Sequence, residues 1–285
     1  MGETIAVVNQ KGGVGKTTTV VNLATYLALA GRHVLLVDLD PQGNATSGLG
    51  IDRNELAGSV YDAIVEDRLI SELARATAVD GLEIVGASTA LAGVEVALAP
   101  LAQRERRLSR ALAPLRDEYD VILLDCPPSL GLITVNALTA ADAVLIPIQS
   151  EYYALEGLGQ LVATIRLIRE HLNPDLAIKG VVLTMVDPRT RLSMDVIAEV
   201  RRHFGEKAYE TVVPRSVRLS EAPSYGKPIA LYSPESKGAA AYRLLAAEFL
   251  RGERAVERST AEGPLASDPG PATTSPDQAA AAVTA

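Results

Sequence analysis

Short apolar runs alternate with helical patterns along almost the whole chain. The runs are rich in Val, Ile and Leu, which is typical of strands covered by helices on both faces. The predicted strands are 4–8, 33–38, 82–86, 120–125, 143–148, 178–186 and 209–213. Helical patterns fall at 17–30, 88–98, 102–117, 155–171, 191–203 and 237–251. This alternation predicts one α/β domain over residues 1–254, with a single doubly wound, mostly parallel sheet flanked by helices.

The pattern ends near residue 255. Segment 255–285 is rich in Ala, Pro, Ser and Thr, and from Ser259 onward it contains no Lys, Arg or aromatic residue. Such a composition buries too little apolar surface to offset the entropy of ordering the chain. We therefore expect a disordered C-terminal tail.

A glycine-rich segment between the first predicted strand and the first predicted helix carries the clearest chemical signal. Glycines expose backbone N–H groups to an anion, and the N-terminus of the following helix adds positive potential. Lys16 would bind the outer phosphates of a nucleotide, and the Thr17 hydroxyl would ligate Mg²⁺. The predicted phosphate-binding residues are consecutive: Lys11, Gly12, Gly13, Val14, Gly15, Lys16, Thr17 and Thr18.

This segment departs from the usual phosphate-loop pattern G-x-x-x-x-G-K-[ST]. The first glycine of the pattern is replaced by Gln10, and an additional lysine, Lys11, follows it. A second cation so close to the phosphates is the feature that most narrows the function. Taken alone, Lys11 is also compatible with an ordinary surface lysine.

Carboxylates stand at the ends of two predicted strands. Asp38 and Asp40 occupy alternate positions, so both can approach the phosphate site from the same side. One of the two could support Mg²⁺ through water, and the other could orient an attacking water. Asp125 ends the apolar run Val-Ile-Leu-Leu and has the Walker B form, which predicts a Mg²⁺ ligand opposite Thr17. The alternative for Asp38 and Asp40 is that they only cap the next turn.

Composition excludes several other kinds of site. The chain has 285 residues, 48% of them hydrophobic, which is enough for a sizeable core. Its one cysteine, Cys126, excludes an internal disulfide and a thiolate metal cage. The three histidines share no ligand spacing. No apolar run reaches the length of a membrane span, so we expect a cytoplasmic protein that does not use the membrane.

Charge is unevenly distributed along the chain. The net charge of −8 argues against a protein that coats nucleic acid with its whole surface, yet residues 179–254 hold 13 Lys and Arg against 9 Asp and Glu. Arg189 and Arg218 follow two neighbouring predicted strands in this region. They are either solvated charges or contacts to a DNA backbone.

Taken together, these motifs resemble the ParA/MinD ATPases, whose phosphate loop carries the same additional lysine and is called a deviant Walker A loop. The similarity to the chromosomal ParA (Soj) branch covers about residues 3–250. Besides the phosphate loop, four stretches carry it: 37–50, 125–131, 151–157 and 214–224.

The resemblance implies a chromosome-partitioning ATPase that uses ATP and Mg²⁺. It implies an ATP-dependent face-to-face homodimer in which Lys11 reaches the partner subunit's ATP, with Lys16 and Asp40 as the other catalytic residues and Thr17, Asp38 and Asp125 at the metal. The segment around Pro214 would lie beside the adenine. The ATP-bound dimer would bind nonspecific double-stranded DNA through Arg189 and Arg218, associate with the nucleoid, and release DNA when a ParB-type centromere-binding protein stimulates hydrolysis.

Two other functions are compatible with the same loop. A membrane-associated division regulator of the MinD type would need a basic amphipathic helix at its C-terminus, whereas this chain ends in a neutral-to-acidic tail. A metabolic ATP-dependent ligase or synthase would need dedicated polar residues for its substrate, and none stands out. A nitrogenase-like iron protein is excluded, since it needs two cluster cysteines in each subunit.

Overall fold

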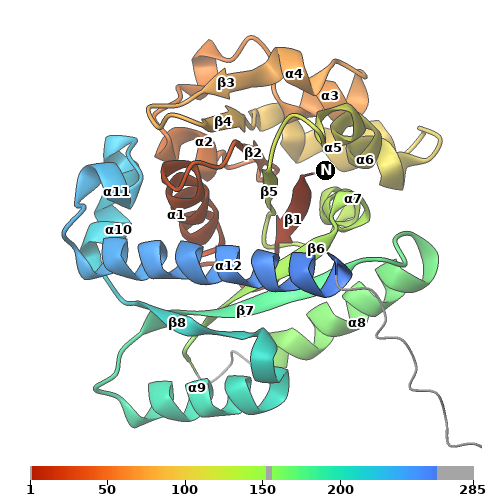
Figure 1. Cartoon of the computed structure of the whole chain (residues 1–285). Coiled ribbons are helices and arrows are strands. Elements are labelled where there is room, and N and C mark those ends of the chain that lie inside the picture. Colours follow the sequence, from red (N-terminus) through yellow and green to blue (C-terminus); the bar gives the residue numbers. More distant parts are fainter. Residues whose placement is uncertain (1, 152–155, 262–285) are drawn as a thin grey trace, which may run out of the picture. The chain divides into compact units, whose positions relative to one another are not determined.

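The computed structural model describes residues 2–151 and 156–261, with only the helical backbone considered for 156–157 and 253–261. Within these ranges, eight strands form one sheet in the order β3-β4-β2-β5-β1-β6-β7-β8 (Figure 1). All pairings are parallel except that of β3 with β4. The strands are β1 (Glu3–Val7), β2 (Val34–Asp38), β3 (Ala74–Ala76), β4 (Leu82–Val85), β5 (Val121–Asp125), β6 (Ala143–Gln149), β7 (Ala177–Val186) and β8 (Ala208–Pro214).

The α-helices in these ranges differ widely in length. The long ones are α1 (Lys16–Leu29), α8 (Glu156–His171), α9 (Arg191–Phe204) and α12 (Lys237–Ala261). The short ones are α2 (Asn44–Gly48), α3 (Val60–Val65), α4 (Ile70–Leu73), α5 (Val94–Leu98), α6 (Arg107–Leu112), α7 (Leu132–Ala140), α10 (Val217–Glu221) and α11 (Ile229–Tyr232). Brief 3-10 turns adjoin several of them.

The predicted doubly wound, mostly parallel sheet is confirmed. Each of the seven predicted strands is present with ends within one residue of those expected. The prediction of one helix over 102–117 is wrong, because the segment is divided into a 3-10 turn, α6 and a second 3-10 turn that contains Pro114. Likewise, 88–98 begins as a 3-10 helix and becomes α5 only at Val94.

Alternate residues of the central strands face opposite layers of helices. Ala6 and Val8 belong to a large buried cluster that includes residues of α3, α5, α6, α7, α8 and α9. The opposite face is covered by α1, which contacts β2, β5 and β6 and packs against α11 (Figure 1). On that side, the buried Tyr242 hydroxyl of α12 lies 3.2 Å from the Thr19 hydroxyl of α1. Both faces of the sheet are therefore buried, which explains the continuous apolar runs.

The register of the central strands brings the predicted acidic residues next to the phosphate loop. Asp125, the last residue of β5, lies between Val7 of β1 and Asp38 of β2. The glycine-rich segment begins directly after β1, so it emerges beside the two carboxylates at the carboxyl edge of the sheet. Ligands of open α/β sheets bind at this edge.

The C-terminal part differs from the predicted boundary. Residues up to Phe249 form one compact unit, and α12 continues through Ala261, into the segment that was expected to be a tail from residue 255. Residues 262–285 lie outside the described part, so the predicted disorder there stays a prediction. Within the described residues, no helix is both long and apolar enough to cross a membrane.

Two leucines of α1 provide a test of the packing. Leu23 is fully buried beneath the sheet, whereas Leu29 in the last turn is 58% exposed. We expect Leu23→Ala to lower the free energy of unfolding by about 2–5 kcal/mol, because it leaves a cavity in the core. Leu29→Ala should change it by less than about 0.5 kcal/mol. Urea unfolding followed by circular dichroism measures both, and equal losses would contradict the packing described.

Candidate nucleotide-binding site

The glycine-rich loop between β1 and α1 is held in place by its neighbours. Gly13 and Gly15 have left-handed backbone conformations, with φ of 73° and 87°, which residues with a Cβ rarely adopt. The Asn9 side chain accepts a hydrogen bond from the Lys11 amide at 2.9 Å. From β7, the Thr184 hydroxyl donates to the Val14 carbonyl at 2.8 Å. The loop therefore has a defined shape, and α1 begins directly after it at Lys16.

Lys16 is buried inside this loop. Its side chain folds back so that Nζ donates to the Lys11 carbonyl at 3.2 Å, and only 7% of the residue is exposed. Burial lowers the pKa of Lys16, while Asp125, Cys126 and Asp40 act in the opposite direction. Thr17 and Thr18 follow in the first turn of α1 and are half-buried. A buried ammonium surrounded by exposed backbone amides is a suitable environment for phosphate groups.

Asp125 is the least satisfied group of the site. The carboxylate is fully buried, and neither oxygen has a hydrogen-bond partner within the described part of the chain. Burial raises the pKa of Asp125 well above its ordinary value; Asp38 adds to the shift, and the Thr17 hydroxyl and Lys16 oppose it. A buried anionic oxygen beside a threonine hydroxyl is what a cation would satisfy.

These residues fit Mg²⁺ bound together with a nucleotide. Among the described residues, no group of three or more His, Cys, Asp or Glu side chains is arranged to hold a metal ion alone. Mg²⁺ is usually bound by one or two carboxylates, water and substrate phosphates rather than by an all-protein cage. Asp125 and Thr17 would hold the ion, which would neutralise phosphate charge when bound.

Asp38 is held by the loop that follows it. One of its oxygens accepts hydrogen bonds from the Thr46 amide at 2.9 Å and the Thr46 hydroxyl at 2.7 Å. The other accepts from the Asp40 amide at 3.2 Å. Burial raises the pKa of Asp38 to about 6, against the lowering effect of the Thr46 hydrogen bonds. Asp38 thus anchors loop 40–46, and direct ligation of a metal would require it to share these contacts.

Asp40 lies in that loop at the mouth of the site and is 8% exposed. Its side chain accepts the Gln42 amide at 2.9 Å, and its carbonyl accepts the Gly43 amide at 2.8 Å. The electrostatic influence of Asp40 on both Lys16 and Asp125 shows that the three charges belong to one cluster. The structure therefore brings together Lys16, Asp38, Asp40 and Asp125, as the strand-end pattern predicted.

Lys11 points away from its own loop. Its Nζ lies 3.5 Å from a carboxylate oxygen of Glu151, and its side chain is 36% exposed. The other oxygen of Glu151 is 3.3 Å from the Arg215 guanidinium. Glu151 belongs to the stretch 151–157, most of which lies outside the described residues. In the monomer, Lys11 is thus an accessible cation beside the site rather than a part of the buried cluster.

The remaining predicted residues lie at the same edge of the sheet but outside that cluster. Pro214 ends β8 and pairs with Val186 of β7, so the two basic loops leave adjacent strands. Arg189 follows β7 and is bound to Asp187, whose pKa it lowers to about 2. Arg218 lies on α10 and pairs with Glu221 at 2.9 Å. Both guanidinium groups are more than half exposed.

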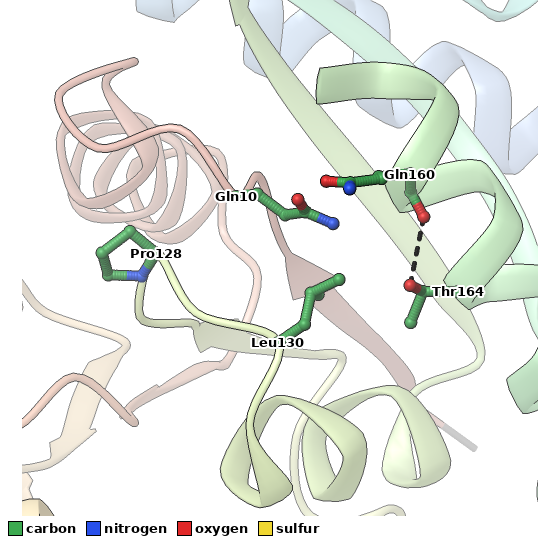
Figure 2. A pocket seen from close by; sticks show the side chains of 5 residues that line it. All are labelled: Gln10, Pro128, Leu130, Gln160 and Thr164. Atoms are coloured by element: carbon green, nitrogen blue, oxygen red, sulfur yellow. Dashed lines mark hydrogen bonds between the residues drawn. The ribbon is translucent and has the colours of Figure 1, made fainter. Parts of the chain in front are cut away.

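A cavity of about 420 Å³ adjoins the phosphate loop. Figure 2 shows Gln10 from the loop, Pro128 and Leu130 from the segment after β5, and Gln160 and Thr164 from α8 around it. The proline-containing segment after Asp125 therefore lies near the start of the phosphate loop. Cys126 is buried, as expected of a small core side chain.

Several supporting residues were not identified from the sequence. Thr46 stands inside one of the similar stretches but carries no chemical signal of its own. In the sequence, nothing distinguishes Thr184 from other strand residues, because its contact with the phosphate loop depends on the position of β7 beside that loop. Nearby, the buried Ser193 hydroxyl donates to the Ser150 hydroxyl at 2.7 Å, and Ser150 in turn contacts the Met185 carbonyl. Polar residues scattered over distant strands give no local pattern from which such a network could be predicted.

A glycine loop that joins a parallel strand to a helix, with a buried lysine and a carboxylate from the adjacent strand, defines the class of P-loop nucleotide-binding proteins. The additional Lys11 agrees with its deviant Walker A members. A family model described as an AAA domain matches residues 2–178.

Comparison with known proteins narrows this class. The chain is 58% identical over 248 residues to the sporulation initiation inhibitor protein Soj of Bacillus subtilis, covering 87% of this chain and 98% of that protein. It is 54% identical over 251 residues to the chromosome partitioning protein ParA of Myxococcus xanthus, covering 88% and 89%. The chain belongs to the ParA/Soj family of chromosome-partitioning ATPases.

Solved structures share the fold. A cobyrinic acid a,c-diamide synthase of Mycobacterium smegmatis, crystallised with ADP and magnesium, superposes with a TM-score of 0.79 at 40% identity, covering 90% of this chain and 97% of that one. The septum site-determining protein MinD of Pyrococcus horikoshii, complexed with Mg-ADP, gives 0.70 at 27% identity, covering 87% and 96%. Nucleotide and magnesium are therefore bound by proteins of this fold.

The unsatisfied Asp125 carboxylate leads to a pH-dependent prediction. Because its pKa in the folded protein is above the ordinary value of 3.8, the folded state holds an extra proton, and stability falls as pH rises above that value. Without nucleotide or divalent cations, Asp125→Asn should be more stable than the wild type by about 1–3 kcal/mol near pH 8, and by less near pH 5.

Urea unfolding in EDTA across this range measures the difference. Asp80→Asn, a change at an exposed carboxylate, is the matched control and should show no such trend. A stability difference for Asp125→Asn that is independent of pH would contradict the buried, unpartnered carboxylate.

Proposed function

We propose that this protein is an ATP-dependent DNA-partitioning switch in the cytoplasm. ATP and Mg²⁺ bind at the phosphate loop, and ATP promotes a face-to-face homodimer. The dimer binds nonspecific DNA on the nucleoid, and hydrolysis, stimulated by a ParB-type centromere-binding protein, releases it. The partitioning role is supported by the names of several relatives that are 48–54% identical to this chain.

One observation carries the proposal: the two lysines of the loop lie in different environments. Lys16 is buried and turned back into its own loop, whereas Lys11 is partly exposed and, among the described residues, is held by a surface ion pair with Glu151. Ion pairs of this kind contribute about 0–1 kcal/mol, so Lys11 can leave it at little cost. A free ammonium at the rim of the site suits contact with a triphosphate on an opposing subunit.

The other residues then have distinct roles. Lys16 binds phosphate within its own subunit, Thr17 and Asp125 hold Mg²⁺, and Asp38 supports the metal through the loop it anchors. Asp40, which lies at the mouth of the site, orients the attacking water. Pro214 forms part of the surface beside the adenine. Since phosphoryl transfer depends mainly on positioning and charge stabilisation, these groups suffice for ATP hydrolysis.

Arg189 and Arg218 would contact the DNA backbone. They emerge from adjacent loops at one edge of the sheet, as the pairing of Val186 with Pro214 requires. Each is paired with an acidic residue close to it in the sequence, so these two guanidinium groups are partly neutralised within a single protomer. Two such faces joined in a dimer bind more tightly than one, because the second contact is intramolecular. ATP-dependent dimerisation thereby controls DNA binding.

A metabolic synthase on the same fold is the second candidate, because one of the similar structures bears such a name. Its identity to this chain is 40%, compared with 54% for the chromosome partitioning protein ParA of Myxococcus xanthus. Among the described residues, the cavity beside the loop is lined by two glutamines, a threonine, a proline and a leucine, none of which is charged. This lining does not favour a carboxylate substrate.

The nucleotide dependence of DNA retention tests the proposed switch. With ATP or a nonhydrolysable analogue, but not with ADP or without nucleotide, the protein should form a dimer that retains random-sequence DNA. Arg189→Ala should weaken DNA binding about equally for all sequences. It should also reduce the slope of log K against log salt concentration by about one for each phosphate contact that is lost. The control is Arg202→Ala, which removes an exposed arginine from the far end of α9. Equal retention without nucleotide would refute the switch.

Three loop variants separate the roles of the charged residues. Lys16→Ala should abolish nucleotide binding. Lys11→Ala should retain ATP binding by the monomer but lose the dimer. Asp40→Ala should bind ATP and accumulate as a dimer that does not turn over. Fluorescent-nucleotide titration, light scattering and phosphate release measure these properties. Normal turnover by Asp40→Ala would show that another group orients the water.

A further inference from the structure

The geometry points to Arg53 as a positioning residue for ATP hydrolysis, acting by fixing the orientation of Asp40. This inference rests on the proposed ATPase function. Arg53 lies in the 3-10 turn Arg53–Glu55 after α2 and was not identified from the sequence. It does not reach the phosphate loop or any of the predicted site residues directly, so its effect has to pass through loop 40–43.

The Arg53 guanidinium binds three backbone carbonyls. Nη2 donates to the Pro41 carbonyl at 2.7 Å, and Nη1 donates to the Gln42 carbonyl at 2.5 Å. Nε donates to the Ala87 carbonyl, beyond the end of β4, at 3.3 Å. The planar, forked guanidinium suits such a set of acceptors, and a lysine ammonium has no equivalent rigid fork. Loop 40–43 is thereby tied to the chain beyond a neighbouring strand.

Two of these bonds determine where the adjacent amides point. In a trans peptide the C=O and N–H groups point in opposite directions. With the Pro41 and Gln42 carbonyls directed at Arg53, the amides of the same two peptide units, those of Gln42 and Gly43, face the other way. Both donate to Asp40: the Gln42 amide to its carboxylate at 2.9 Å, and the Gly43 amide to its carbonyl at 2.8 Å.

The positive charge of Arg53, bound at the carbonyl of each peptide unit, also strengthens the hydrogen bond that the amide of the same unit donates to Asp40, since linked hydrogen bonds polarise one another. Arg53 therefore directs the Gln42 amide at the Asp40 carboxylate and fixes the backbone from which that carboxylate projects. The close fit of the guanidinium depends on Gly43: a Cβ at this position would overlap Arg53 Nε, and the φ of 63° already favours glycine.

The consequence concerns turnover rather than ATP affinity. Without Arg53, the peptides at 41–43 can rotate, and Asp40 loses its fixed position relative to the phosphates. A displacement of about 1 Å in a positioned group can reduce a rate about a hundredfold. Lys16, Thr17 and the glycine loop do not contact Arg53, so ATP binding should be retained.

Single-turnover hydrolysis of Mg-ATP by the full-length chain, together with ATP affinity from fluorescent-nucleotide titration, tests the inference. We expect Arg53→Ala to reduce the hydrolysis rate about 10- to 100-fold while the Kd for ATP changes less than about twofold. Arg53→Lys should recover only a small part of the loss. Arg68→Ala is the matched control, because Arg68 also donates to a loop carbonyl, that of Ala57, but away from Asp40. It should hydrolyse ATP at the wild-type rate.

A double-mutant cycle shows whether Arg53 acts through Asp40. Measured over long incubations, Arg53→Ala added to Asp40→Ala should change the residual rate less than about twofold. An Arg53→Ala protein with wild-type turnover, a parallel loss of ATP affinity, or an undiminished Arg53 effect in the Asp40→Ala background would overturn the inference. If the wild type hydrolysed no ATP, the proposed function itself would fail.

Discussion

The site depends on an excess of buried negative charge at the carboxyl edge of the sheet. Asp125 is fully buried, with no hydrogen-bond partner in the part of the chain that the structure describes, and it lies in register with Asp38, whose pKa burial raises to about 6. Lys16 is the buried cation of the cluster, and burial lowers its own pKa. Without a ligand, one positive group faces several acidic ones in a medium that screens poorly. The arrangement is relieved when a metal cation and its nucleotide complete the charge balance.

Much of this could be predicted from the sequence, because the relevant information is local. The strand–glycine–helix order, the two lysines and the aspartates at the strand ends are each visible within about ten residues. The alternation of elements then leads to a parallel sheet, which brings the strand ends together. The structure agrees for Lys16, Asp38, Asp40 and Asp125, whose charges form one cluster.

What could not be predicted depends on contacts between distant segments. Short helices such as α2 and α10 have too few turns to produce a periodic pattern. The break in 102–117 follows from local backbone geometry at Gln103, whose φ is 51°, and from Pro114. Thr184 and Arg53 act through backbone carbonyls, and any sequence supplies such acceptors, so no motif marks these two residues. Residues that hold a site in shape are therefore harder to find than those that carry its chemistry.

The phosphate loop and the basic edge are also linked through the interior. Thr184 binds the Val14 carbonyl, and its own carbonyl accepts the Ser150 amide at 3.1 Å. The Ser150 hydroxyl then meets that of Ser193, which accepts the Asp187 amide at 3.2 Å, and Asp187 holds Arg189. Between Thr184 and Val186, Met185 has a left-handed φ of 52°, unusual for a residue other than glycine.

The exposed cations at this edge of the sheet are each paired with an acidic residue of the same protomer. Lys11 and Arg215 share Glu151, Arg189 is bound to Asp187, and Arg218 is bound to Glu221. Each of these pairs is exposed and screened by water, so each can be exchanged for a stronger anionic partner at low cost. Since the same cations are partly neutralised within one protomer, the proposed switch would bind DNA only weakly as a monomer. Under the same proposal, a large change in affinity would require two such edges to be joined in a dimer, and the partly exposed position of Lys11 beside the phosphate loop allows this.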